Sequence, residues 1–444
     1  MCFRRWSNRS LWWVVQIAGG LLATYLWIVS DGAILHDEIG HFLISRNSWR
    51  YPELILDVWG RVGTTLTYMV PALGGWELAR AASFGIALLT AAVATRVARE
   101  IGVRSLYLVP LFLWAQPWFS EASFTVVTEV PFSLLLVWGA YTAMRGRHLT
   151  ASMAFGILPL VRHEGLLITL LWSVGTVATR RWGAGLVAWL PFVGYNLVHY
   201  AAIGSWPFEV MLEPSPSTFY GSGGWFHFVP RVVVNAGLPV AILALLGARR
   251  LLALRPAFVW AYVTYLGTHV VLYRFGLFAS AGYSIFLLPL APALAVAATL
   301  GIEEIRAMLD RFGILQHRWR QVLTAIVLVA IVNAALTVTP HSLGDEGVAV
   351  QDAATWLRDS GTEHDQVWSS HVWFYHFADL NWTPQRMWST PIDLEAAPSG
   401  TLLVWDSRYA PRMGAPYEAL ESSSDDWETL WASENQAAVV FRRR

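Results

Sequence analysis

The sequence predicts a polytopic α-helical membrane protein of about eleven transmembrane helices, followed by a soluble C-terminal α/β domain. Of the 444 residues, 55% are hydrophobic and 14% are charged, whereas about 25% are charged in an average soluble domain. Apolar runs recur over residues 1–339 and then stop, and the charge changes there too: 24 arginines and 15 acids precede residue 340, and 7 arginines and 16 acids follow it. We therefore expect a membrane domain over 1–339 and a soluble domain over 340–444. A disordered chain, a fibrous protein and an ordinary soluble enzyme are excluded.

A transmembrane helix needs about 20 mostly apolar residues. Eleven segments are candidates, of which the fifth and sixth are short and meet at residues 162–165. The segments are 11–30, 78–96, 105–120, 124–144, 149–161, 165–179, 183–203, 229–247, 256–273, 283–300 and 321–338. Glycine and proline interrupt residues 62–76, so we expect a helix at the membrane interface there.

The arginines predict the orientation. All 31 basic residues are arginine, and a cytoplasmic N-terminus places 17 of those before residue 340 inside and 7 outside, as the positive-inside rule requires. Eleven spans then place the C-terminal domain outside. We expect a multi-pass protein of a prokaryotic plasma membrane whose first span is a retained signal-anchor. The single cysteine, Cys2, excludes a disulfide framework and a cysteine-built metal centre.

The first expected outer loop concentrates ionisable side chains. His36, Asp37, Glu38 and His41 fall within six residues, and in a helix Asp37 and His41 lie on one face. A carboxylate beside histidine can take a proton from a hydroxyl group or help to hold a divalent cation, although these ligand types do not identify the metal. Alternatively, Asp37 simply caps a helix.

Several short motifs together resemble the GT-C glycosyltransferases, in particular the branch of protein O-mannosyltransferases and aminoarabinose transferases. An acidic pair at the start of the first outer loop is the first of them. The turn at 162–165 resembles the "R-P-E-G" turn of these enzymes, with His163 where proline is usual. The residues that carry the resemblance are His36-Asp37-Glu38, Trp59-Gly60-Arg61, Pro71-Ala72-Leu73-Gly74, Ala79-Arg80-Ala81-Ala82-Ser83, Thr128-Glu129-Val130-Pro131 and Arg162-His163-Glu164-Gly165.

This resemblance implies a GT-C-like fold over roughly residues 10–340 and a specific reaction class. Such an enzyme moves a sugar from a polyprenyl-phosphate carrier to a hydroxyl acceptor on a glycan, lipid or protein, and it inverts the anomeric centre. Asp37 is then the candidate base, and Glu38 is the alternative base or a partner of Asp37. His36 and His41 are candidates for substrate contact. No cofactor is certain, Mg²⁺ or Mn²⁺ is compatible with the carboxylates, and the metal ligands are unknown. No nucleic acid partner is implied.

The leaving phosphate of such a donor needs positive charge, and arginine binds phosphate through a bidentate fork. Arg61, Arg80, Arg162 and Arg274 are the candidates on the expected outer side. Arg162 is favoured, because it lies in a tight turn beside His163 and Glu164. For each arginine, the alternative is an interfacial anchor or a salt bridge.

Two further regions supply candidate contacts for sugar or acceptor. Glu129 lies about five residues into a predicted span, where a carboxylate is costly unless it is paired or faces a cavity. The alternative is an internal ion pair with one of the arginines. The loop 204–229 is rich in glycine, serine, proline and aromatic residues. Trp225 and His227 are its site candidates, Tyr220 could stack on a sugar, and Trp206 fits an aromatic belt at the membrane interface.

The C-terminal domain shows a helical stretch at 352–358 and strand-like runs at 366–376, 401–405 and 437–441, which predict a small α/β domain. His371, His376 and Asp379 could be taken for a metal site. On a strand, however, the two histidines point to opposite faces, and a packed aromatic core is the preferred interpretation.

Two other function classes compete with the enzyme. One is a transporter or flippase for a lipid-linked sugar. Two features argue against transport: the sequence shows no internal repeat, and its ionisable residues cluster on the expected outer side. The other is a non-catalytic envelope assembly protein. The sequence names neither the sugar nor the acceptor.

Overall fold

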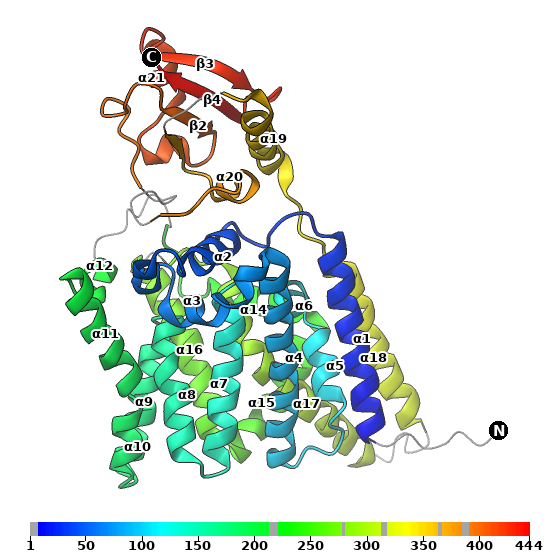
Figure 1. The fold of residues 1–444 in the computed structure, drawn as a ribbon. Helices are drawn as coiled ribbons and strands as arrows, with labels where there is room; N and C mark the ends of the chain where they lie inside the picture. Colours follow the sequence, from blue (N-terminus) through cyan, green and yellow to red (C-terminus); the bar gives the residue numbers. More distant parts are fainter. Residues whose placement is uncertain (1–7, 213–220, 278–279, 312–317, 363–365, 384–389) are drawn as a thin grey trace. The chain divides into compact units, whose positions relative to one another are not determined.

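The computed structural model describes residues 8–212, 221–277, 280–311, 318–362, 366–383 and 390–444. The described chain is mostly helical, with one small sheet near its C-terminus (Figure 1). It divides into two compact units. The first comprises Met1–Ile28, Arg61–Thr67 and Arg80–Pro340, and the second comprises Val29–Gly60, Tyr68–Ala79 and His341–Arg444.

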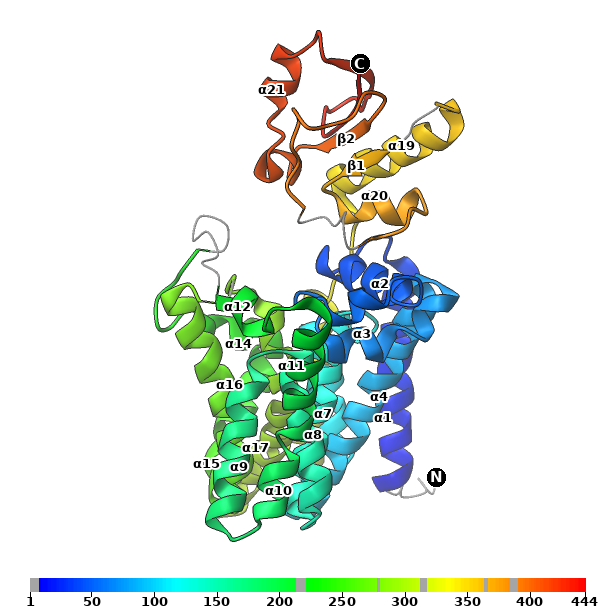
Figure 2. The ribbon, with the colours of Figure 1, turned by 60° about the vertical axis from the view of Figure 1, so that its left-hand side comes forward.

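The first unit is a bundle of apolar helices, many of which run side by side in both ribbon views (Figures 1 and 2). The helices wholly or mostly within it are α1 (Asn8–Val29), α3 (Val62–Tyr68), α4 (Trp76–Ile101), α5 (Leu108–Trp114), α6 (Pro117–Ala122), α7 (Glu129–Met144), α8 (His148–Val161), α9 (Gly165–Ala178), α10 (Trp182–Val187), α11 (Leu190–Ile203), α12 (Pro207–Leu212), α14 (Phe228–Ala236), α15 (Leu238–Leu254), α16 (Pro256–Phe275), α17 (Ala291–Arg311) and α18 (Trp319–Thr337). The 3-10 segment η3 (Ser284–Leu290) leads into α17.

All eleven predicted spans fall on helical segments, but several of these segments are broken. Within the described residues, five helices are long and apolar enough to cross a membrane, or six if the bent pair α14–α15 is one span. The bend of 109° in that pair lies at Gly237, whose φ of 73° suits glycine. The span predicted at 105–120 breaks into α5 and α6 before Pro117, because proline lacks the N–H for the helical hydrogen bond and its ring crowds the preceding turn. The count of eleven stays a prediction.

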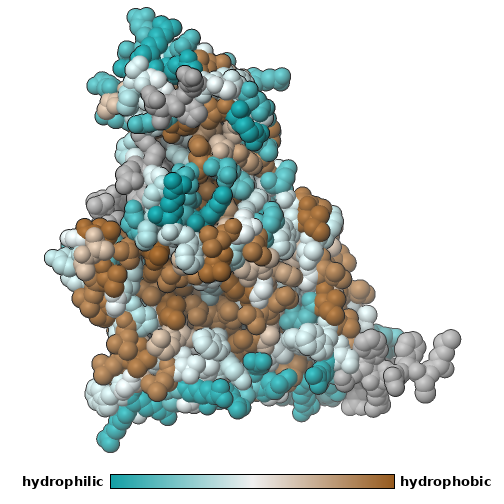
Figure 3. Space-filling model, viewed as in Figure 1, coloured by the Kyte–Doolittle hydropathy of each residue, from teal (hydrophilic) through white to brown (hydrophobic). Residues whose placement is uncertain are grey.

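The surface of the first unit is apolar over a broad band (Figure 3). Large apolar side chains are widely exposed there, including Ile28 at 77%, Leu245 at 77% and Leu336 at 79%. In water such a surface would be costly, whereas lipid chains solvate it. This distribution is that of a multi-span membrane protein.

Two helices of the bundle approach each other unusually closely. A Cβ atom placed on Gly247 of α15 would lie 2.0 Å from the carbonyl oxygen of Ala297, and one on Gly301 of α17 would lie 2.1 Å from that of Leu243. The glycines therefore let the two backbones touch, as small residues do in membrane helix pairs.

The second unit contains a four-stranded sheet with the order β1-β2-β4-β3. Its strands are β1 (Val367–Ser369), β2 (Leu402–Asp406), β3 (Trp427–Ala432) and β4 (Ala438–Arg443). β1 pairs with β2 in parallel, and the other two pairs are antiparallel. Helices α19 (Gly344–Ser360), α20 (Val372–Phe377) and α21 (Tyr417–Ser422) complete this part. The core between sheet and helices includes Leu403, Trp405, Trp427 and Phe441.

The small C-terminal sheet is confirmed, with two differences in detail. The strand predicted over 366–376 ends at Ser369, and Val372–Phe377 is helical, because a short apolar run fits a strand and a buried helix equally well. The strand Trp427–Ala432 was not predicted.

Residues from the first expected outer loop also belong to the second unit. They form α2 (Asp37–Asn47) and the 3-10 segments η1 (Pro52–Leu56) and η2 (Pro71–Gly74). The backbone N–H of Gly32 donates to the carbonyl of His341 at 3.1 Å, and that of Leu343 donates to Asp31 Oδ1 at 3.0 Å. The division at residue 340 and the interfacial position of 62–76 stay predictions.

We expect Gly247→Ala to destabilise the bundle and Gly267→Ala to leave it intact. The first adds a methyl group against a backbone carbonyl, and such overpacking typically costs about 1–3 kcal/mol. The second lies in α16 with open space around it, where alanine favours the helix by roughly 0.5–1 kcal/mol. Thermal unfolding of the purified proteins in detergent measures both; equal melting temperatures would contradict the close approach.

Candidate functional site

The acidic pair begins α2, and the two carboxylates have different surroundings. Asp37 is the first helical residue and is exposed, whereas Glu38 is fully buried. The indole nitrogen of Trp76 donates to Glu38 Oε1 at 3.2 Å. His36, and not Asp37, occupies the N-cap position, so the capping alternative for Asp37 does not hold. The negative charge of Asp37 in the first turn instead interacts favourably with the positive end of the helix dipole. Asp37 is therefore accessible to a bound molecule, and Glu38 helps to fix the helix.

The histidines of this loop are held by aromatic side chains of the second unit. The ring of His41 stacks on Trp59 with centroids 4.7 Å apart. Gly40 permits this, because an added Cβ would lie 2.7 Å from the indole. His36 Nδ1 lies 2.9 Å from the hydroxyl of Tyr409.

Burial, with smaller contributions from His371 and Arg408, lowers the pKa of His36 to about 3, and burial raises the pKa of Tyr409. At neutral pH, His36 is therefore uncharged and Tyr409 keeps its proton, which it can donate to His36.

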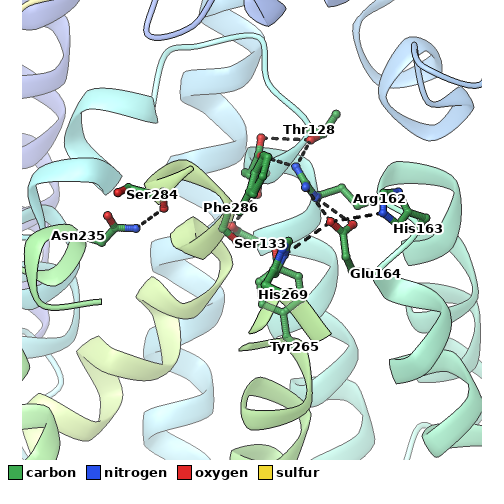
Figure 4. A network of polar contacts seen from close by, with 11 residues as sticks. Thr128, Ser133, Arg162, His163, Glu164, Asn235, Tyr265, His269, Ser284 and Phe286 are labelled. Atoms are coloured by element: carbon green, nitrogen blue, oxygen red, sulfur yellow. Dashed lines mark hydrogen bonds and ion pairs between the residues drawn. The ribbon is translucent and has the colours of Figure 1, made fainter. Parts of the chain in front are cut away.

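A buried polar network lies inside the helix bundle of the first unit (Figure 4). Arg162 is the first residue after α8, and Glu164 is the last residue before α9. The guanidinium donates to Glu164 through Nε at 3.2 Å and Nη2 at 2.9 Å. Its Nη1 donates to Glu129, the first residue of α7, and to the hydroxyl of Thr128 at 2.9 Å. One arginine therefore holds three helices together.

Aromatic and imidazole rings surround this network. The guanidinium lies over the ring of Phe286, 4.6 Å from its centroid. His163 Nε2 and His269 Nε2 each lie 3.7 Å from Glu164 Oε1. His269 stacks on Phe286, and the hydroxyl of Tyr265 donates to the Phe286 carbonyl at 2.7 Å. Figure 4 shows these side chains converging on Arg162 and Glu164.

The network has consequences for the roles predicted for Arg162 and Glu129. Both are almost fully buried, and they form the ion pair that was the alternative interpretation for each. The donors of Arg162 are directed at two carboxylates and a hydroxyl. A phosphate would have to compete with them, so Arg162 suits a positioning role better than phosphate binding.

Arg80 and Ser83 hold the segment that leads to Glu129. The guanidinium of buried Arg80 lies 5.5 Å from the ring centroid of Phe124, and the Ser83 hydroxyl donates to the carbonyl of Thr125. Arg61 precedes α3 with a positive φ of 60°, a conformation that is uncommon for arginine.

Three other candidates gather at the ends of α14 and α16. His227 lies against Tyr273 with ring centroids 4.2 Å apart, and its Nε2 lies 3.0 Å from the Gly282 carbonyl. Arg274 is exposed and lies 6.0 Å from the ring centroid of Trp225. No carboxylate among the described residues forms an ion pair with Arg274. Tyr220 lies outside the described residues.

Phe228 connects this cluster to the buried network. Its ring lies 5.9 Å from Tyr273 and 6.1 Å from His269. Arg162, His163, Glu164 and Glu129 are therefore brought together, and Trp225, His227 and Arg274 form a neighbouring group. The sequence analysis missed His269, Tyr265 and Phe286. A histidine inside an apolar helix is costly, and that signal could have identified His269.

The metal set considered from the sequence does not form. His376 packs against Phe42, Trp76 and Trp373, and Asp379 pairs with Arg46 at 2.9 Å. Among the described residues, the group with ligand atoms close enough for a metal ion is instead Glu346, His371 and Asp406.

Comparison with known proteins shows the fold. No family model matches the sequence, and the search of curated proteins gives no match. The crystal structure of ArnT from Cupriavidus metallidurans bound to undecaprenyl phosphate matches 97% of both chains with a TM-score of 0.65 and 16% sequence identity. The same protein in the apo state matches 98% of both chains with a TM-score of 0.60 and 16% identity. The chain therefore shares the fold of ArnT, an aminoarabinose transferase of the GT-C class.

We expect Arg162→Met to destabilise the protein strongly, because it leaves two buried carboxylates without their cation. Removing one partner of a buried pair typically costs about 3–5 kcal/mol. Adding Glu129→Gln and Glu164→Gln should restore much of the loss. Thermal unfolding in detergent measures both variants.

The matched control is Arg250→Met. Arg250 pairs with Glu303 and Glu304, but its side chain is 37% exposed, and exposed pairs contribute roughly 0–1 kcal/mol. If the single and triple variants at the buried network unfolded at the same temperature, the coupling would be refuted.

Proposed function

We propose that this protein is a glycosyltransferase that moves a sugar from a polyprenyl-phosphate carrier to a hydroxyl acceptor and inverts the anomeric centre. The observation that carries the proposal is the match along 97% of both chains to ArnT bound to undecaprenyl phosphate. The motifs at residues 36–38, 79–83 and 162–165 support the same reaction class. Fold alone does not establish function, so the roles must follow from the side chains.

Asp37 is the proposed base. In the reaction the acceptor oxygen bonds to the anomeric carbon, the bond from that carbon to the phosphate oxygen breaks, and the hydroxyl proton passes to Asp37. Three features support the assignment: Asp37 is exposed, it starts a helix, and its neighbour Glu38 is buried against Trp76. Glu38 is then a positioning residue for α2, and it is the alternative base.

Arg274 is the proposed cation for the leaving phosphate. It is exposed and has no ion-pair partner among the described residues. A guanidinium held over Trp225 keeps its N–H groups available for two phosphate oxygens. Arg61 is a second candidate, whereas the buried partners of Arg80 and Arg162 favour structural roles for them.

Trp225, His227 and His41 are proposed to contact the sugar or the acceptor. Trp225 is exposed and its ring lies 5.9 Å from that of Phe275, while the rings of His227 and Tyr273 lie 4.2 Å apart. Aromatic rings present apolar faces on which a sugar can stack. We further propose that the reaction takes place on the outer face of a prokaryotic plasma membrane, with the C-terminal domain on that side.

We expect Asp37→Asn to abolish sugar transfer while folding persists, because an amide cannot accept the hydroxyl proton. Loss of a general base typically lowers kcat by about 10²–10⁴-fold. The measurement is sugar transfer in proteoliposomes from a panel of polyprenyl-phosphate sugars. Asp359→Asn, an exposed change near the end of α19, is the matched control.

The alternatives give different results in the same assay. Equal transfer by Asp37→Asn and wild type would move the role of base to Glu38, Glu129 or Glu164. Movement of the lipid-linked sugar across the bilayer without a transferred product would indicate a flippase. If no donor of the panel gave sugar transfer or movement of the lipid-linked sugar across the bilayer, the result would favour an assembly protein.

We expect Arg274→Gln to raise the KM for the lipid-linked donor by roughly 10–100-fold, since a hydrogen bond to a charged group contributes about 1.5–3 kcal/mol. The KM for the acceptor should stay close to that of wild type. Initial rates over a range of donor concentrations measure the change, with exposed Arg249→Gln as the control. An unchanged donor KM would exclude Arg274 from phosphate binding.

A further inference from the structure

We propose that the second unit carries a divalent transition-metal site formed by Glu346, His371 and Asp406. One ligand atom from each of these residues lies within 4.8 Å of the other two. His371 and Asp406 are fully buried, and Glu346 is partly buried. This site is separate from the carboxylates that the proposed transfer reaction uses.

The parallel strands bring two of the ligands together. β1 and β2 pair in the register Ser369 with Val404. His371 and Asp406 each follow two residues later, so they leave the same end of adjacent parallel strands. The carboxyl ends of parallel strands are where α/β sheets generally bind ligands.

Glu346 reaches this place from the first turn of α19. Its Oε1 lies 3.0 Å from His371 Nε2. Two ligands that each lie about 2.0–2.2 Å from one zinc ion are separated by roughly 3–3.5 Å, so this pair already has the spacing of neighbouring ligands. Arg408 lies 3.5 Å from the other oxygen, Oε2, which leaves Oε1 directed at His371.

Asp406 has one oxygen in use and one without a partner. Its Oδ1 accepts the backbone N–H groups of Arg408 and Tyr409. Its Oδ2 is buried and has no hydrogen-bond partner, and neither has His371 Nδ1. A buried acceptor left unsatisfied is destabilising. A cation between the three side chains would satisfy the carboxylate oxygen.

The ligand types select the metal. One imidazole nitrogen and two carboxylate oxygens suit Zn²⁺ or Mn²⁺ better than Mg²⁺, which prefers oxygen ligands and water. Three protein ligands leave a fourth position for water. We therefore expect Zn²⁺ to bind more tightly than Mn²⁺, and Mn²⁺ more tightly than Mg²⁺.

The site would also stabilise the start of the first expected outer loop. Tyr409 contacts both Asp406 and His36: its backbone N–H donates to Asp406, and its hydroxyl lies against the His36 ring. The His36 ring also lies 5.0 Å from that of His371. His36 directly precedes α2. An ion at Asp406 and His371 would therefore restrain both the sheet end and the residue before Asp37.

The test is metal analysis of the full chain, purified in detergent with a tag that contains no histidine. Mass spectrometry of the elements should give about one Zn²⁺ per chain after expression in zinc-supplemented medium. Treatment with a chelator should lower the melting temperature by several degrees. Added Zn²⁺ should restore it, Mn²⁺ should restore part of it, and Mg²⁺ should have little effect. This readout does not require sugar transfer, so it separates the metal site from the proposed activity.

Variants locate the ion. Glu346→Gln, His371→Asn and Asp406→Asn should each lower the zinc content at least tenfold. His376→Asn and Asp393→Asn are the matched controls, because His376 is a histidine of the adjacent helix α20 and Asp393 accepts two backbone N–H groups as Asp406 does. Both controls should keep one ion.

A cobalt experiment covers the case in which a buried variant fails to fold. Glu346 is only partly buried, so Glu346→Cys should fold and should bind Co²⁺ with a thiolate-to-cobalt absorption band that wild type lacks. Wild type without bound metal and without a change in melting temperature on adding any of the three ions would overturn the proposal. Equal zinc loss in Asp393→Asn and Asp406→Asn, or a cobalt complex of Glu346→Cys without the thiolate band, would also overturn it.

Discussion

The ion pairs that Arg162 makes with Glu129 and Glu164 are the interaction on which the helix bundle of the first unit depends. A buried charge in an apolar surrounding is costly unless it is paired and its donors are satisfied. Here one guanidinium binds two carboxylates and a hydroxyl group and lies over the ring of Phe286. Because the partners belong to α7 and to the turn between α8 and α9, the pairing fixes how these helices meet.

Around this network, the bundle relies on close packing of apolar helices. Gly247 and Gly301 let α15 and α17 touch, and Phe228 and Phe286 join the aromatic cluster at Tyr273 to His269. Polar side chains are therefore supported by rigid neighbours. Such support is what a site needs if its groups are to keep their positions while a lipid-linked substrate binds.

The second unit follows a different principle, since a segment from the N-terminal part of the chain completes a C-terminal domain. Backbone hydrogen bonds connect Gly32 to His341, and the Tyr409 hydroxyl contacts His36. His36, the residue directly before Asp37, is thus fixed by a side chain 373 positions away in the sequence. This explains why the domain and the loop form one unit even though Arg80–Pro340 of the first unit lies between them in the sequence.

The sequence by itself determined the class of protein, the positions of the apolar helices and the stretches where ionisable residues gather. These properties are local, because hydropathy over about 20 residues and the pattern of charges do not depend on distant contacts. It also identified Glu129 as a costly charge and Arg162 as a candidate phosphate-binding cation, and for each it left an ion pair as the alternative. The tertiary structure pairs the two side chains with each other, and it adds His269 and Phe286 as neighbours. It likewise placed Glu346 and Asp406 beside His371, a set whose spacing along the chain carries no recognisable pattern. The physical reason is that the cost of burying a charge is set by the residue, whereas its partner is set by the packing of elements far apart in the chain.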